Sequence, residues 1–68
     1  MTTIVFERRF LGTGETVRLG AAKRHQNGWR FYPNNAARKP SRKDHPTLES
    51  CLPRWLNYPD GCMSREEV

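Results

Sequence analysis

The chain has 68 residues, of which 35% are hydrophobic, and a formal net charge of +5. A chain of this length forms at most one small domain and buries only about 60% of the surface that its unfolded form exposes. Its apolar runs are much shorter than the ~20 residues that a membrane-spanning helix needs, and no signal peptide is evident. We therefore expect a cytoplasmic protein without membrane contact.

The charge is spread unevenly along the chain. Ten of the twelve basic residues lie in residues 1–43, which hold only two acidic ones, whereas residues 44–68 hold two basic and five acidic residues. Such asymmetry is typical of an interaction surface on the basic side. An acidic partner is therefore expected, with a role in solubility alone as the alternative.

Two segments alternate apolar and polar side chains with the period of a β-strand. They are residues 2–11 and 16–21, separated by turn residues. A hairpin that pairs Phe10 with Val17 puts both apolar sets on one face, with Ala21 in the second set. The sequence thus predicts a first antiparallel hairpin.

The turn after His25 sets the register of a third strand over residues 29–32. A two-residue turn would put Trp29 on the face opposite to the apolar set of the second strand, because a slip of one residue reverses every side chain. A three-residue loop over residues 26–28 pairs His25 with Trp29 and unites the apolar faces. We therefore predict that loop, with Gly28 in the left-handed conformation.

The C-terminal third contains one helix signal after a long proline-rich loop, residues 34–45. Thr47 is a good N-cap, and apolar residues then follow at helical spacing up to Trp55. Pro53 should kink the helix or restart it as a second short turn, because it removes a backbone donor.

The predicted fold class is α+β. A three-stranded antiparallel sheet carries one C-terminal helix on one face, in the order β-β-β-loop-α. Residues 1–58 form the domain, and residues 59–68 are a loop and a flexible C-terminal tail.

The large aromatic residues of so small a core, Trp29 and Phe31 among them, should point inward. The alternation then gathers cations and a phenol on the opposite sheet face: Arg9, Arg18, Arg30 and Tyr32. Guanidinium groups reach phosphates and the N7/O6 edge of guanine, and an antiparallel ribbon fits the major groove. This face is a candidate nucleic-acid surface, although an ordinary solvated face is the alternative. Arg8 falls on the apolar side, so we expect its stem to pack near an edge with its head in water.

The loop after Pro33 carries a second cluster of cations: Arg38, Lys39, Arg42 and Lys43. Its prolines limit the entropy that docking would cost, and such cations contact phosphates without reading sequence. If ~6 phosphates were neutralised, the log–log slope of affinity against salt would be near −5. A mobile charged loop with no partner is the alternative.

Catalysis and metal binding find little support in the sequence. The segment "GTGETVRLG" lacks both the lysine of a P-loop and the spacing of a dinucleotide site, and no triad is recognisable. The histidines and cysteines lack the spacing of a zinc site. We expect no enzyme activity, metal or cofactor. Cys51 and Cys62 should be free thiols in the cytoplasm, although their separation would permit a disulfide.

The order of these features resembles a known family. The run "GWRF" at residues 28–31, the basic stretch after it and the helix that opens at Thr47 resemble the arm-binding N-terminal domain of phage-type tyrosine recombinases over roughly residues 16–57. That domain has three strands and a helix and sets its sheet in the DNA major groove. The resemblance implies that the outward sheet positions that touch bases are Arg18, Arg30 and Tyr32. The long loop and Pro53 depart from the family's pattern.

The letters "GWRF", "RKPSRK" and "HPT" also resemble a group of small stand-alone proteins of bacterial and phage genomes, which implies no particular activity.

We therefore expect a small basic nucleic-acid-binding module, with double-stranded DNA as the favoured partner and RNA still open. The alternative is a protein-interaction module that binds an acidic partner or forms a homodimer through an open sheet edge. Single-stranded binding is a third option, for which only Tyr32 and Tyr58 are available as stacking platforms.

Overall fold

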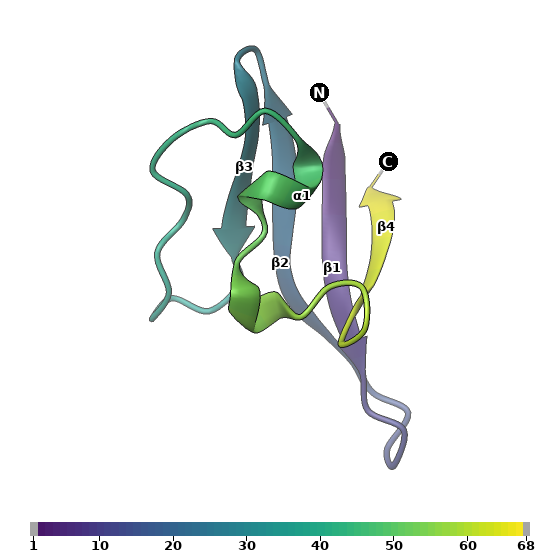
Figure 1. Cartoon of the computed structure of the whole chain (residues 1–68). Coiled ribbons are helices and arrows are strands. Elements are labelled where there is room, and N and C mark those ends of the chain that lie inside the picture. The colour runs from purple at the N-terminus through teal and green to yellow at the C-terminus, as the bar shows by residue number, and fades with distance from the viewer. Residues whose placement is uncertain (1, 68) are drawn as a thin grey trace.

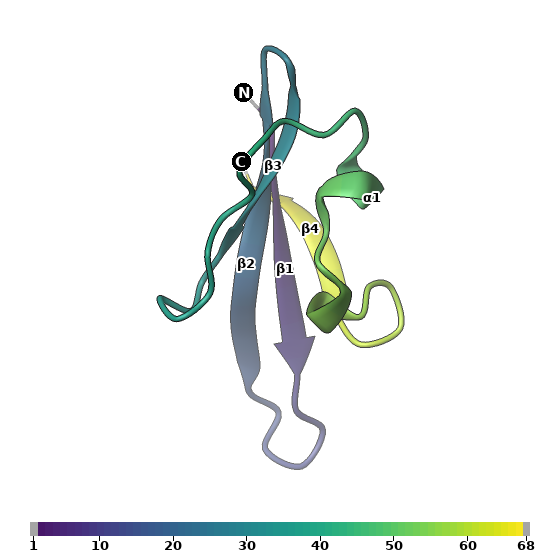
Figure 2. The same cartoon turned by 60° about the vertical axis from the view of Figure 1, so that its left-hand side comes forward.

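Residues 2–67, which the computed structural model describes, form a four-stranded antiparallel sheet with a short helix against one face (Figures 1 and 2). The strand order is β3-β2-β1-β4. The elements in chain order are β1 (Thr3–Arg9), β2 (Thr16–His25), β3 (Gly28–Pro33), helix α1 (Leu48–Cys51), the 3-10 turn η1 (Arg54–Leu56) and β4 (Met63–Glu67). The α+β class with an antiparallel sheet and one short helix is as predicted, but the number of strands is not.

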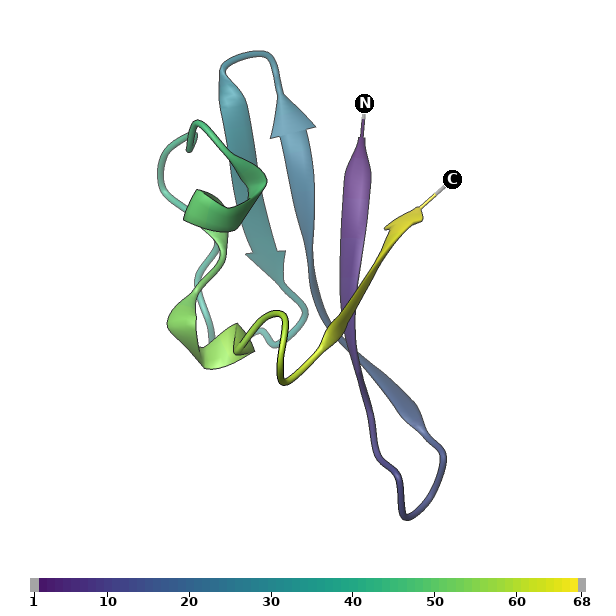
Figure 3. The ribbon, with the colours of Figure 1, turned by 45° about the vertical axis from the view of Figure 1, so that its right-hand side comes forward.

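The additional strand is β4, within the segment that was predicted to be a loop and a flexible tail. It pairs antiparallel with β1, from Thr3 opposite Glu67 to Glu7 opposite Met63, and lies beside β1 in Figure 3. All five of its side chains are exposed. The sequence of this strand therefore has no alternation of apolar and polar residues that would predict it. Backbone pairing with β1 holds it in place. The last residue of the predicted tail, residue 68, lies outside the described residues.

A β-bulge in β2 changes the predicted face of the second strand. Phe6 pairs with Gly20 but Glu7 pairs with Arg18, so Leu19 is the extra residue between them. Beyond the bulge the alternation is displaced by one residue. Ala22, not Ala21, therefore joins the helix-side core.

The predicted pairing of Phe10 with Val17 is also wrong at the tip of the hairpin. The amide of Phe10 donates to the carbonyl oxygen of Glu15 at 2.8 Å, and Val17 lies opposite Arg8. The turn therefore spans residues 11–14. It extends well beyond the helix-covered part of the sheet (Figures 1 and 3).

The bulge also explains why the predicted three-residue loop after β2 is wrong. His25 pairs with Gly28, which leaves only residues 26 and 27 in the turn. The longer loop was needed to place the apolar residues of both strands on one face. Because the bulge has already shifted β2 by one residue, the shorter turn brings Ala22 opposite Phe31 on the helix side.

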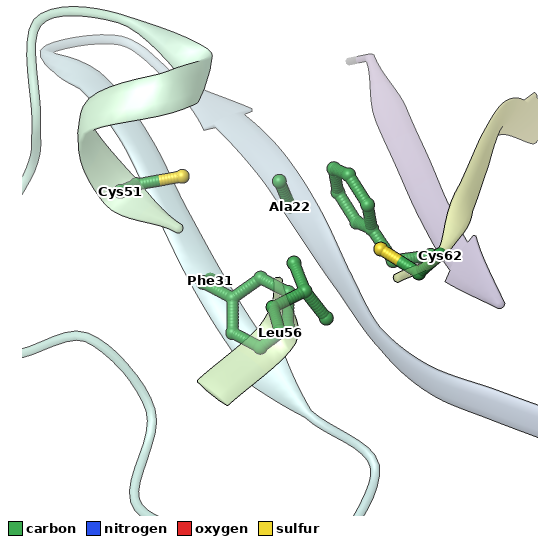
Figure 4. Close-up of a cluster of buried hydrophobic side chains, with 6 residues drawn as sticks. Ala22, Phe31, Cys51, Leu56 and Cys62 are labelled. Carbon is green, nitrogen blue, oxygen red and sulfur yellow. The ribbon is translucent and has the colours of Figure 1, made fainter. Parts of the chain in front are cut away.

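The core lies between the sheet and the segment formed by α1 and η1. Figure 4 shows Cys51 and Leu56 pointing from this segment toward Ala22 and Phe31 of the sheet. The relative exposure is 2% for Phe31 and 0% for Leu56, and the partly buried Trp29 packs against this cluster. The inward orientation of Phe31 and Trp29 is therefore confirmed.

The helix begins and ends where the sequence indicates. The hydroxyl of Thr47 accepts from the amide of Ser50 at 3.2 Å, and the Ser50 hydroxyl accepts from the amide of Thr47. This reciprocal cap satisfies two otherwise unpaired donors. Pro53 ends the first turn and serves as the N-cap of η1, so the restart is confirmed. No helix among residues 2–67 combines the length and the apolar character that crossing a bilayer requires.

The long loop after β3 packs along the outer edge of that strand. Trp29 and His45 exchange two backbone hydrogen bonds of 2.8 Å, and the amide of Ser41 donates to the carbonyl oxygen of Phe31 at 3.0 Å. Gly28 makes this approach possible, because a Cβ there would collide with the carbonyl oxygen of His45. The loop thereby covers one edge of the sheet.

Candidate nucleic-acid interface

The sheet face turned away from α1, hereafter the open face, carries most of the predicted sheet residues. Antiparallel partners share a face, and the pairs Glu7–Arg18, Lys23–Arg30 and Ala21–Tyr32 all lie on this side. Arg9 follows by alternation at the exposed end of β1. The sequence therefore predicted correctly that Arg9, Arg18, Arg30 and Tyr32 share this face, but it did not place Lys23 and Ala21 there.

Arg30 forms an ion pair with Asp44 of the loop. Its Nε lies 2.6 Å from Oδ1 of Asp44, whose side chain is only 18% exposed. The hydrogen bond and charge of Asp44 raise the pKa of Arg30, so the guanidinium is firmly charged but partly compensated. From the alternation of residues alone, Arg30 was predicted to be exposed to water without a partner. Its ion pair with Asp44 shows that this prediction was wrong.

Two further ion pairs connect charged groups of the open face. Nη1 of Arg18 lies 3.3 Å from Oε2 of Glu67, and Nε of Arg65 lies 2.8 Å from Oε1 of Glu7. Both pairs depend on β4, which the sequence did not predict. The open face is thus a mixed-charge surface instead of the arginine-rich one that was expected.

Tyr32 is also engaged within the protein. Its hydroxyl lies 2.8 Å from Nε2 of His25, and Nζ of Lys23 lies 5.4 Å from the centroid of its ring. Val5 and Ala21 are buried on this side of the sheet. A base would have to displace Lys23 to stack on this ring from that side.

The basic loop, residues 34–45, presents the other predicted cluster with little compensation. Within residues 2–67, no ion pair involves its four exposed cations: Arg38, Lys39, Arg42 and Lys43. The loop is tied to β3 through Ser41 and His45, as described above. The same loop supplies Asp44, which compensates Arg30 and not its own cations.

Arg38 does not join the open face. Its guanidinium carbon lies 4.3 Å from the centroid of the Trp55 ring in η1, on the helix side of the sheet. The structure therefore places the eight predicted residues at three locations. Four lie on the open face, three lie on the part of the basic loop beside β3, and Arg38 lies on the helix side beside Trp55.

Beside Arg38 the surface is hollowed between the base of the β1–β2 hairpin and the start of the basic loop. This arginine hollow has a volume of about 410 Å³. Its lining residues are Arg8, Val17, Arg18, Leu19, Asn34, Asn35, Arg38 and Trp55. Sequence analysis missed the hollow, although the position of Arg8 on the apolar side of β1 was a signal that its head emerges near an edge.

The cysteines do not add a reactive site. Both are free thiols and buried. Burial raises the pKa of Cys51 to about 11 and also raises the pKa of Cys62, so both are protonated at neutral pH. Protonated thiols are poor nucleophiles. Among residues 2–67, no three histidine, cysteine or acidic side chains gather as a metal site would need.

Comparison of the chain with protein-family models, with curated proteins and with solved structures finds no match. The functional argument therefore depends on the geometry described above.

Proposed function

We propose that the protein binds nucleic-acid duplexes without sequence preference, chiefly through phosphate contacts made by the basic loop. The observation that carries this proposal is the concentration of three exposed cations without ion-pair partners, Lys39, Arg42 and Lys43, on a loop that hydrogen bonds tie to β3. Phosphate contacts of this kind supply affinity and orientation but no base readout. Tying the loop to the sheet lowers the entropy that binding would cost.

The open face contributes less in this proposal than the sequence indicated. Arg30 and Arg18 would have to give up or share their carboxylate partners to bind a phosphate. The cations of the basic loop have no such partner to give up within residues 2–67. The interface therefore centres on the outer edge of β3 and not on the broad surface of the sheet.

Duplexes are favoured over single strands by the state of the aromatic residues. Sequence-tolerant binding of single strands uses exposed rings as stacking platforms. Lys23 lies over Tyr32, and Arg38 lies over Trp55. Both rings are therefore already occupied on one side by a cation of the protein.

The test is a salt titration of binding to a labelled random-sequence duplex, followed by fluorescence anisotropy. The double variant Arg42→Gln/Lys43→Gln should weaken binding and reduce the salt slope by about 1 for each phosphate that is no longer neutralised. The matched control is Arg24→Gln/Arg54→Gln, which removes two exposed cations outside the loop. Binding without salt dependence, or an equal weakening in both double variants, contradicts the proposal. A larger effect from Arg30→Gln than from the loop variant would move the interface to the open face.

A second candidate function, self-association, is favoured by the uncovered outer edge of β4. Within the described residues β4 ends the sheet on one side, whereas the basic loop covers the edge on the other side. An uncovered strand can pair with the same strand of a second copy. Sedimentation over a range of concentrations should then show a dimer, and a monomer throughout would exclude this function. Leu11, which is 94% exposed at the hairpin tip, supplies the control: a dimer abolished by Leu11→Ser would lie at the hairpin and not at β4.

A further inference from the structure

The arginine hollow is lined by two arginines of the helix side that come from separate parts of the chain. Arg8 belongs to β1 and Arg38 to the basic loop, whereas Arg18, which also borders the hollow, directs its guanidinium to Glu67 on the open face. Asn34 and Asn35 belong to the same lining, and Oδ1 of Asn35 already accepts a hydrogen bond from the amide of Ala37. A guanidinium only donates, and the NH2 group of an asparagine also donates. The lining therefore has the composition of a site for an anion.

Each of the two arginines is held by one contact that leaves further donors free. Nε of Arg8 donates to the carbonyl oxygen of Gly61 at 2.9 Å. The guanidinium of Arg38 rests on the Trp55 ring. Because a guanidinium carries five N–H donors, these contacts orient the groups without exhausting them. The donors are in place before a ligand arrives, which lowers the cost of binding.

The charge around the hollow indicates the charge of its ligand. Within residues 2–67 no ion pair involves Arg8 or Arg38. The hollow therefore carries about two positive charges. A phosphate monoester carries ≈ −1.5 to −2 charges at pH 7 and three acceptor oxygens, whereas a carboxylate or a phosphodiester carries one. The monoester matches this charge.

We propose that the arginine hollow binds a phosphate monoester. Its volume of about 410 Å³ falls within the ≈ 300–1,000 Å³ range of small-ligand sites. Val17, Leu19 and Trp55 supply apolar lining for the organic part of the ester. The ester can be a free small molecule or the terminal phosphate of a strand. The second source rests on the proposed function. Because the hollow adjoins the basic loop, it would bind the terminal phosphate of a nucleic-acid strand while the loop contacts phosphates along that strand.

The direct test uses nuclear magnetic resonance on the labelled full chain and no duplex. Titration with a nucleoside 5′-monophosphate should shift the side-chain amide signals of Asn34 and Asn35 and the indole signal of Trp55. The unphosphorylated nucleoside and a methyl phosphodiester of the nucleotide should bind at least ~10-fold more weakly, because they offer fewer charge-assisted hydrogen bonds. Arg38→Gln should weaken binding of the monoester by a similar factor, while Arg42→Gln, outside the lining, should leave it unchanged.

A second arm identifies the source of the phosphate. Duplexes with and without terminal 5′-phosphates are compared by anisotropy, and a preference of about 10-fold for phosphorylated ends that disappears in Arg38→Gln assigns the strand end. Monoester binding without an end preference assigns a small phosphate ester instead, and both results support the site.

The site is refuted if the nucleoside and its monophosphate bind alike, or if the shifts fall away from the hollow. Failure of duplex binding in the salt titration would remove the proposed function and leave the monoester titration unaffected, so the two failures are distinguishable.

Discussion

Replacing Gly20 with alanine tests the bulge on which the register of the sheet depends. A Cβ on Gly20 would lie 2.5 Å from Cζ of Phe31 and 2.7 Å from the carbonyl oxygen of Tyr32. Atoms cannot approach so closely, and the carbonyl oxygen belongs to β3, which the pairing with β2 holds in place. The substitution must therefore displace the Phe31 ring, the backbone of β3, or both.

The expected magnitude follows from two opposing contributions. Overpacking of a filled core costs about 1–3 kcal/mol, whereas alanine restricts the unfolded chain and returns about 0.4–1 kcal/mol. Because one of the two clashes involves backbone, we expect a net destabilisation in the upper half of the range, about 1.5–2.5 kcal/mol. For a domain of this size each kcal/mol corresponds to roughly 4–8 °C in Tm.

The assay is urea unfolding followed by tryptophan fluorescence and circular dichroism, with Gly12→Ala as the matched control. A Cβ on Gly12 meets nothing within 4 Å, so the control should be as stable as the wild type or slightly more stable. In the Gly20→Ala background, Phe31→Leu should cost less than it does alone, since the ring that clashes is then removed. A Gly20→Ala protein as stable as the wild type would refute the packing of Phe31 beneath the bulge.

Two further predictions concern the core. Leu56→Ala should destabilise the protein by about 2–5 kcal/mol in urea unfolding, because the side chain is fully buried; Leu11→Ala, at the exposed tip, should stay within about 0.5 kcal/mol, and equal effects would show that the core is misplaced. The raised pKa of Cys51, about 11, means that the native thiol keeps a proton that the unfolded thiol releases above its ordinary pKa. The stability that Cys51 contributes is thus complete at pH 8, where its S–H donates to the carbonyl oxygen of Leu48. It should fall by up to about 1.4 kcal/mol per pH unit between pH 9 and 11. A stability difference between the wild type and Cys51→Ala that stays constant from pH 8 to pH 10.5 would contradict this linkage.

Local features of this protein could be predicted from the sequence because neighbouring residues decide them. Alternation marks β1, β2 and β3, the hydroxyl of Thr47 caps the helix, and Pro53 ends its first turn. Because so small a domain has few apolar residues, the large side chain of Phe31 is buried. The same local rules gathered Arg18, Arg30 and Tyr32 on one face.

The tertiary structure decided the register and the charge of the candidate surfaces. The bulge at Leu19 depends on how Phe31 packs against Gly20, and β4 has no apolar pattern because all its side chains are exposed. The partners of Arg30 and Arg18 lie 14 and 49 residues away along the chain. Such contacts form only when the fold brings distant segments together. The sequence therefore indicates which residues of one strand share a face, whereas the tertiary structure decides which strands join that face and what its net charge is.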